Sequence, residues 1–172
     1  MTVPIVKSSV DVAIWFFDQA RRDDIHMPAI KLQRLLWIAQ GLYAAMNHGR
    51  MLIPAIFVAD ETGPLEQTVY HVFEDGRPML MQHKLPVEAE NFLSRLWTRY
   101  GHHSSDFLSR QTKHSDPYVA ALREGSGTVI EFAEIAKHFT QPPDRHRKVA
   151  AADGRLLQKW LPTAKPVSPK LG

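Results

Sequence analysis

Nine histidines are the side chains with the widest chemical range in this sequence, since a histidine can bind a metal ion or transfer a proton. The densest group is His102, His103 and His114. Adjacent residues of a helix point about 100° apart, so His102 and His103 would rarely share one ion. The sequence has no Cys and no HExxH motif, so a structural zinc would need only His and carboxylate ligands. We therefore expect no metal site and place these histidines at helix caps and on the surface.

Serine and glycine residues form no catalytic or nucleotide-binding motif. No Ser lies in a G-x-S-x-G context, and no strand–turn–helix segment is predicted that could present one. The glycines are scattered, without a Walker A or GxGxxG motif, and the run Gly125–Gly127 is typical of a helix end. These patterns predict a protein that is not an enzyme, with no catalytic residue and no cofactor.

Positive charge is concentrated in the C-terminal part of the chain. Residues 1–140 hold 14 Lys and Arg and 16 Asp and Glu, a balance of −2, whereas residues 141–172 hold 7 and 2, a balance of +5. A basic tail favours contact with an anion such as a nucleotide or nucleic acid, and such binding would be weakly sequence-selective and salt-sensitive. The alternative is a solvated tail that only aids solubility. The candidate anion-binding residues are Arg145, Arg147, Lys148, Arg155 and Lys159.

The same tail contains a short apolar cluster of Leu156, Leu157, Trp160 and Leu161. One helical turn could place these side chains on one side, which predicts a short amphipathic helix. An exposed Trp beside three Leu is unusual without a partner. The cluster could therefore contact a second protein, fold back onto the body or stay disordered.

The hydrophobic spacing of the body predicts six or seven helices. Apolar side chains recur at three- and four-residue steps between capping residues and Gly or Pro stops. The expected helices are Ser8 or Ser9 to Arg22, Pro28–Asn47, Thr68–Asp75, Pro86 or Val87 to Tyr100, one capped by Ser104 or Ser105, Asp116–Glu124 and Glu131–Phe139.

The helix expected at residues 28–47 is unusually apolar. Its polar exceptions are Lys31, Arg34 and Gln40. A DNA-recognition helix exposes several polar and basic side chains, so this helix does not fit that role. We expect it to be the central helix of the body, with neighbours on several sides.

The stretch between residues 51 and 67 is predicted to be extended or irregular. Met51–Ala59 is apolar but contains Pro54, which restricts it to an edge strand or an extended segment. Thr128–Ile130 could pair with it. Asp60–Gln67 is expected to be a loop that turns at Gly63-Pro64.

Together these elements predict a mostly α protein. We expect a compact helical bundle with at most a small two-stranded element over residues 8–140, and a basic tail over residues 141–172. The N-terminal stretch MTVPIVKSSVDVA lacks the uninterrupted apolar core of a signal peptide, and no run approaches the roughly 18 apolar residues that span a membrane. With no Cys, the chain is expected to be cytoplasmic, without membrane contact.

Several motifs occur in one order along the body. The first is IKLQRLLWIAQG at residues 30–41, which is followed by Gly49, Gly63-Pro64-Leu65, Val69-Tyr70 and Gly76. Further motifs are Leu96, Tyr100-Gly101, Ser104-Ser105, Leu108, Thr112-Lys113-His114, Pro117-Tyr118 and the helix Ile130–Phe139. Taken together, they resemble the Panacea domain family over about residues 8–140. The chain departs from that family at Asp60-Glu61-Thr62, where an aromatic-x-Tyr is usual, and at Leu65, where Val is usual.

The resemblance implies a cytoplasmic bacterial protein-binding domain. Relatives act as antitoxins that neutralise a toxin encoded by the adjacent gene through direct contact, and one type delivers its toxin to an ATP-dependent protease. The family offers no catalytic residue to carry over. The alternative function is a regulatory protein that binds an anionic ligand through the basic tail.

A bound toxin would bury an interface whose energy is concentrated in a few aromatic or charged side chains. For each aromatic candidate the alternative is plain core packing. The candidates in the body are Trp15, Phe16, Trp37, Asp60, Glu61 and Leu65, and those in the tail, for a second partner, are Leu156, Leu157 and Trp160.

Overall fold

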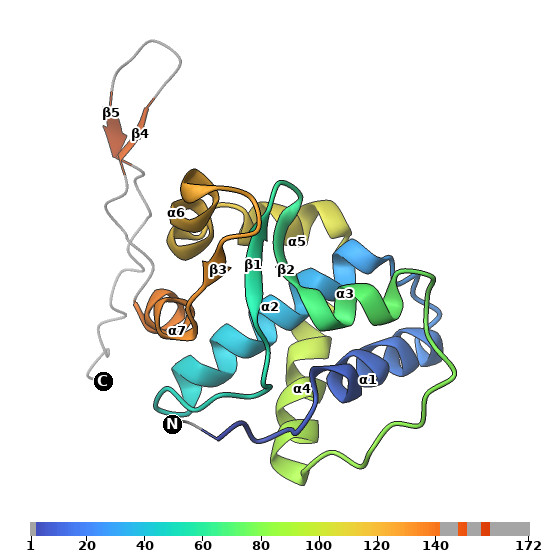
Figure 1. Cartoon of the computed structure of the whole chain (residues 1–172). Coiled ribbons are helices and arrows are strands. Elements are labelled where there is room, and N and C mark those ends of the chain that lie inside the picture. The colour runs from blue at the N-terminus through green and yellow to red at the C-terminus, as the bar shows by residue number, and fades with distance from the viewer. Residues whose placement is uncertain (1–2, 142–147, 151–155, 159–172) are drawn as a thin grey trace, which may run out of the picture. The chain divides into compact units, whose positions relative to one another are not determined.

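Seven helices and a three-stranded sheet are found in the computed structural model, which describes residues 3–141, 148–150 and 156–158 (Figure 1). The predicted mostly helical fold is confirmed. The chain divides into two units, Met1–Thr140 and Gln141–Gly172. The helices are α1 (Ser9–Arg22), α2 (Ala29–Met46), α3 (Gln67–Phe73), α4 (Val87–Tyr100), α5 (Ser105–Thr112), α6 (Asp116–Glu124) and α7 (Phe132–Thr140), and the strands of the first unit are β1 (Phe57–Asp60), β2 (Gly63–Glu66) and β3 (Val129–Ile130).

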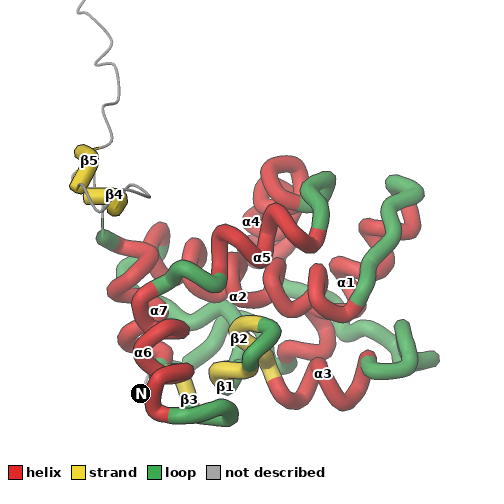
Figure 2. The backbone as a smooth tube through the Cα atoms, turned by 90° about the horizontal axis from the view of Figure 1, so that it is seen from above, coloured by secondary structure: helices red, strands yellow, loops and turns green. Residues whose placement is uncertain are grey.

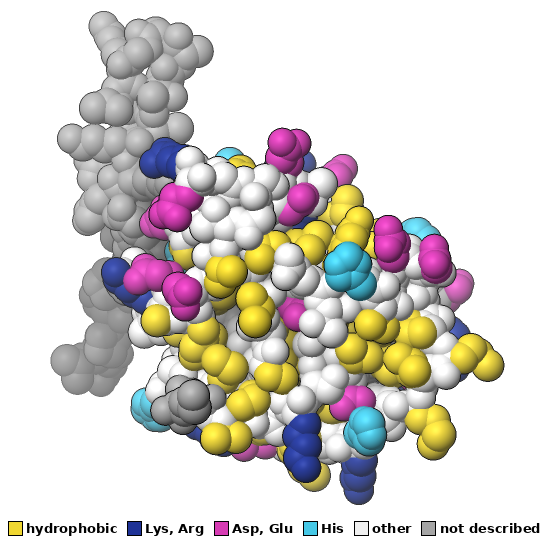
Figure 3. All heavy atoms as spheres, in the orientation of Figure 1, with side chains coloured by type: hydrophobic (Ala, Val, Ile, Leu, Met, Phe, Trp, Pro, Cys, Tyr) yellow, Lys and Arg dark blue, Asp and Glu magenta, His cyan; other side chains and the backbone are white. Residues whose placement is uncertain are grey.

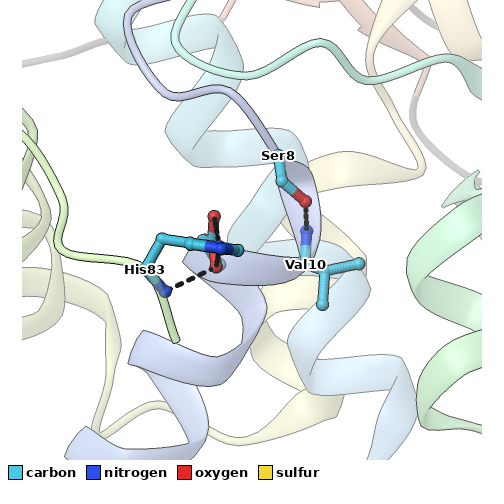
Figure 4. Close-up of polar contacts among 4 residues, drawn as sticks. Ser8, Val10 and His83 are labelled. Atoms are coloured by element: carbon cyan, nitrogen blue, oxygen red, sulfur yellow. Dashed lines mark hydrogen bonds and ion pairs between the residues drawn. The ribbon is translucent and has the colours of Figure 1, made fainter. Parts of the chain in front are cut away.

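The helices begin at the predicted capping residues or one residue away from them. The hydroxyl of Ser8 accepts a hydrogen bond from the amide of Val10 at 3.2 Å, at the start of α1 (Figure 4). Ser104 caps α5 in the same way. The predicted cap of α6, Asp116, is instead its first helical residue, and Ser115 occupies the cap position.

Helix α2 lies at the centre of the first unit, as predicted. It contacts α1, α3, α4, α5, α7 and β2 (Figures 1 and 2). Every residue from 31 to 41 is buried, including the polar ones. On one side, Phe139 of α7 packs so closely on Gly41 that a Cβ there would overlap its ring. A polar side chain buried on this helix costs free energy unless it is paired inside the protein.

Gln40 provides such a partner for the segment that leads from α2 to the sheet. Its Nε2 donates to the carbonyl of Ile53 at 2.9 Å, and its Oε1 accepts from the amides of Leu52 and Ile53, both at 3.1 Å. On the other side, the amide of Val6 donates to the carbonyl of Leu52 at 2.9 Å. The side chain of Gln40 therefore replaces a neighbouring strand for this extended segment.

The sheet is antiparallel with strand order β2-β1-β3. The predicted pairing of the apolar extended segment with Thr128–Ile130 is confirmed, since Phe57 pairs with Ile130 and Val58 with Val129. The sheet has one strand more than expected. The predicted loop Asp60–Gln67 is a tight hairpin, in which Asp60 pairs with Gly63 and the chain continues as β2. Pro64 fits there because β2 is an edge strand.

The connection between α3 and α4 runs alongside α1 and is attached to it at two points. Nε and Nη2 of Arg77 donate to the carboxylate of Asp18 at 2.9 and 3.2 Å. The backbone amide of His83, whose ring is seen beside α1 in Figure 4, donates to Oδ1 of Asp11 at 3.0 Å. Between the attachments, three apolar side chains are exposed: Met79, Leu80 and Met81.

In the second unit, β4 (Lys148–Ala150) pairs with β5 (Leu156–Gln158) in an antiparallel hairpin. The predicted amphipathic helix is therefore wrong at Leu156 and Leu157. A helix of so few residues is unstable by itself, and here the backbone bonds of these residues go to β4 instead. The remaining residues of the predicted cluster, Trp160 and Leu161, lie outside the described residues. Among the described helices, none combines the length and apolar character needed to cross a membrane.

The contacts of Gln40 predict a large loss of stability when its polar group is removed. Gln40→Leu keeps the apolar volume but leaves two buried amides and one carbonyl without a partner. We expect the free energy of unfolding in urea to fall by about 3 kcal/mol, since each unsatisfied buried group costs roughly 1–3 kcal/mol. The matched control is Gln19→Leu on α1, where the amide bonds only to Arg22 at the surface, and it should change stability by less than about 0.5 kcal/mol. Equal effects of the two substitutions would contradict the role given to Gln40.

Candidate functional site

Arg34 is a buried cation that bonds to the turn and the outer edge of the β1–β2 hairpin. The residue is 1% exposed. Its Nη1 donates to the carbonyl of Pro64 at 2.8 Å, its Nη2 donates to the carbonyl of Thr62, and its Nε donates to the hydroxyl of Ser109 at 3.3 Å. Burial lowers the pKa of Arg34, while Tyr118 and Asp60 act in the opposite direction. An arginine stays charged in proteins, so the hairpin rests on a permanent positive charge that is bonded to its carbonyls.

Two further contacts fix the tip of the hairpin. The hydroxyl of Tyr118 donates to the carbonyl of Asp60 at 2.7 Å. Oδ2 of Asp60 accepts from the amide and the hydroxyl of Thr62, at 2.8 and 2.6 Å. These bonds from Thr62 lower the pKa of Asp60. The carboxylate is therefore ionised at neutral pH, and the tip presents it in one defined position.

Gly63 is required where the hairpin turns back. Its φ of +133° lies in a region that residues other than glycine avoid. A Cβ at this position would also overlap the guanidinium of Arg34. The turn and the buried cation therefore depend on each other.

The outer edge of β2 is closed by side chains of α2. Nε2 of Gln33 donates to the carbonyl of Glu66 at 3.2 Å, and the amide of Glu66 donates to Oε1 of Gln33 at 2.7 Å. Pro64 has no N–H, and its carbonyl accepts from Arg34. An edge strand normally offers unpaired backbone groups to another chain, but these groups of β2 are already paired.

Glu66 connects the sheet to α3. Its carboxylate caps the helix by accepting from the amide of Val69 at 2.6 Å. The residue is 2% exposed, and burial raises the pKa of its carboxyl group. This cap fixes α3 directly after β2, so the exposed side of α3 lies beside the sheet (Figure 1).

A cleft of about 580 Å³ lies over the outer face of the sheet, the face that carries Val58, Asp60 and Leu65. We call it the sheet-face cleft. Figure 3 shows this side of the molecule, where hydrophobic side chains gather in patches and acidic side chains lie among and around them. The residues that line the sheet-face cleft are Ala29, Ile30, Gln33, Arg34, Val58, Asp60, Thr62, Leu65, Gln67, Tyr70, His71, Ser126 and Gly127.

A second cleft of about 390 Å³ lies beside the tip of the hairpin, and we call it the tip cleft. It is lined by Glu61, Lys113, Tyr118, Val119, Leu122 and Arg123. Adjacent acidic residues of the tip therefore belong to different clefts, because Asp60 lines the sheet-face cleft and Glu61 the tip cleft.

The structure separates the predicted partner-binding residues of the body into two groups. Asp60, Glu61 and Leu65 come together at the hairpin and line the clefts. The assignment of Phe16 and Trp37 as contact residues is wrong for this structure, because both side chains are fully buried in the core. Trp15 is half-buried on α1 and packs edge-on against the ring of Phe16 at 5.5 Å.

Sequence reasoning missed several residues that build the site. Gln33 and Arg34 close the hairpin edge, and Ile30 and Tyr70 form exposed apolar walls of the sheet-face cleft. A signal for Arg34 was present, since it is a charge inside an otherwise apolar helix. Nothing in the local sequence indicated that Tyr70 on α3 would be exposed.

The histidines form no metal site among the described residues, and most of the predicted tail residues lie outside them. In the described part of the chain, no three His, Asp or Glu side chains come together as metal ligands. Nε2 of His102 lies 3.8 Å from the carboxylate of Asp23, and the ring of His103 stacks on Phe107 at 4.0 Å. Of the predicted anion-binding residues, Lys148 begins β4. The other four, Arg145, Arg147, Arg155 and Lys159, lie outside the described residues, as does Trp160.

No family model, curated protein or solved structure matches this chain. Several residues of the sequence motifs described above contact one another in the structure. Gln33 and Arg34 of the first motif bond to β2, which contains Gly63-Pro64. Gly41 of the same motif receives Phe139 of α7. These residues belong to the framework of the fold, whereas Asp60, Glu61, Thr62 and Leu65 lie at the clefts.

The dual constraint on Gly63 predicts that it tolerates alanine poorly. We expect Gly63→Ala to lower the free energy of unfolding by about 3–4 kcal/mol, because backbone strain and displacement of Arg34 add together. Gly49→Ala is the control, since Gly49 also has a positive φ (+77°) but has open space around it. It should cost about 1–2 kcal/mol from backbone strain alone. Similar losses in the two variants would show that the contact with Arg34 adds nothing.

Proposed function

We propose that this chain is a bacterial antitoxin-type protein-binding domain that neutralises a partner protein by direct contact. The observation that carries the proposal is the sheet-face cleft, a largely apolar hollow over a hairpin held by Arg34 and Tyr118. The antitoxin role and a partner encoded by the adjacent gene come from the sequence resemblance. The proposal assigns no enzymatic activity to the chain.

The rigidity of the hairpin supports a binding role. Three sets of bonds act on Asp60, Thr62 and Pro64: those of Arg34, that of Tyr118 and those between Thr62 and the side chain of Asp60. A surface that is already fixed in its binding shape loses little conformational entropy on association. The buried cation therefore contributes to binding without touching the partner.

The composition of the cleft also fits protein recognition. Tyr70 is 37% exposed and Ile30 is 45% exposed, and they stand beside the paired residues Val58 and Leu65. Aromatic and aliphatic anchors at the centre of a patch, with polar groups at its margin, are typical of binding hot spots. We assign the anchor role to Tyr70, Ile30 and Leu65, in place of the buried Phe16 and Trp37.

Two further roles stay predictions. Delivery of the partner to an ATP-dependent protease would involve Leu156, Leu157 and Trp160. Binding of a nucleotide or nucleic acid would involve the basic tail residues. Both depend chiefly on tail side chains for which the structure gives no contacts.

The proposal predicts complex formation with the product of the adjacent gene. On co-expression, the two proteins should co-purify, and this chain should suppress the toxicity of its partner. Tyr70→Ala combined with Leu65→Glu should weaken the complex at least about 100-fold, because it removes an anchor and places a charge in the apolar floor. The control is Met79→Ala, which removes an exposed apolar side chain from the connection beside α1.

Circular dichroism and thermal unfolding should show that the variants remain folded. If the two proteins neither co-purify nor affect each other's toxicity, the proposed function is wrong. If they do but the double variant binds normally, the function stands and the sheet-face cleft is not its site.

A further inference from the structure

We infer that the partner segment bound in the sheet-face cleft presents a large apolar side chain next to a Lys or Arg, and that it docks through side chains rather than by adding a strand. This inference rests on the proposed function and specifies the chemistry of the partner. Three features of the site carry it: the closed edge of β2, the apolar floor and the carboxylate of Asp60.

The closed edge of β2 argues against recognition by strand addition. A peptide that extends a sheet needs unpaired backbone groups along the edge strand. The amide and carbonyl of Glu66 bond to Gln33, and the carbonyl of Pro64 bonds to Arg34. The opposite edge, β3, has only two residues. A partner is therefore left with the outer face of the sheet.

The outer face offers an apolar floor with apolar walls. Val58 and Leu65 are directly opposite each other on β1 and β2. Ile30 of α2 and Tyr70 of α3 are the exposed apolar side chains beside them. A volume of about 580 Å³ can receive a few large side chains. The floor therefore selects an aromatic or branched aliphatic side chain.

The charges of the cleft favour a cationic neighbour for that side chain. Among the residues that line the cleft, one is acidic, Asp60, and one is an arginine, Arg34. The guanidinium of Arg34 is directed to carbonyls of the hairpin, whereas the carboxylate of Asp60 is ionised and only partly buried. Directly after α3, Glu74 and Asp75 are exposed four residues beyond Tyr70 and His71. A Lys or Arg at Asp60 would be attracted, and an acidic side chain would be repelled.

The adjacent carboxylates provide a matched pair of variants. Asp60→Asn removes the charge from the sheet-face cleft while its side-chain oxygen can still accept from Thr62. Glu61→Gln removes the same charge one residue away, in the tip cleft beside Lys113 and Arg123. The two variants have equal net charge, so a difference between them reports the position of the cation and not a general electrostatic effect.

The test is a selection of random 12-residue peptides displayed on phage against the immobilised full-length chain, followed by affinity measurements on synthetic peptides. Enriched peptides should carry an aromatic or aliphatic residue within four positions of a Lys or Arg. Asp60→Asn should weaken them about tenfold, as expected for a charge-assisted contact, whereas Glu61→Gln should change affinity less than about twofold. Tyr70→Ala should weaken them at least about tenfold, and Met79→Ala should have no effect.

Other outcomes would overturn the inference. Acidic peptides, peptides sensitive to Glu61→Gln but not to Asp60→Asn, or no enrichment at all would contradict the chemistry assigned to the cleft. Binding could also be abolished by N-methylation of the peptide backbone while side-chain substitutions in the peptide are tolerated. That result would indicate strand addition instead. Because the selection does not use the product of the adjacent gene, these failures are distinct from a failure to co-purify with that protein.

Discussion

The fold depends on hydrogen bonds between buried polar side chains of the central helix α2 and backbone groups of the neighbouring segments. Gln40 bonds to the extended segment at Leu52 and Ile53, and Gln33 and Arg34 bond to β2. Without these bonds, a short irregular segment packed against an apolar helix would leave its amides and carbonyls unpaired. Because each side chain replaces part of a missing strand, a small sheet can be held inside a mostly helical protein.

The same arrangement determines which surface is free to bind. Arg34 lines the cleft, but its guanidinium donates to the carbonyls of Pro64 and Thr62 in the hairpin. Gln33 closes the edge of β2, so the sheet cannot readily extend into another chain. The outer face remains, with Asp60 and the apolar residues Leu65 and Tyr70. The binding proposed for this face would therefore depend on how α2 pairs the edge of β2.

The helices were predictable from the sequence because caps and hydrophobic spacing are local signals. Ser8, Ser104 and the Gly after α6 mark their ends within a residue or so. The hairpin was not predictable, because Gly63-Pro64 is equally typical of a loop, and only distant contacts with Arg34 and Tyr118 make it a strand. The site was partly predictable. Asp60, Glu61 and Leu65 lie at the clefts, but the burial of Phe16 and Trp37 is a tertiary property that local sequence does not reveal.

We conclude that one buried cation, Arg34, holds the hairpin in its shape. Hydrogen exchange in the Arg34→Gln variant tests it most directly, with the amides of β1 and β2 compared with those of α4. We expect exchange to become at least about 100-fold faster in the hairpin, because its local opening no longer breaks the bonds of a charged group, while α4 keeps its protection. Unchanged exchange in the hairpin, or an equal acceleration throughout the chain, would contradict it.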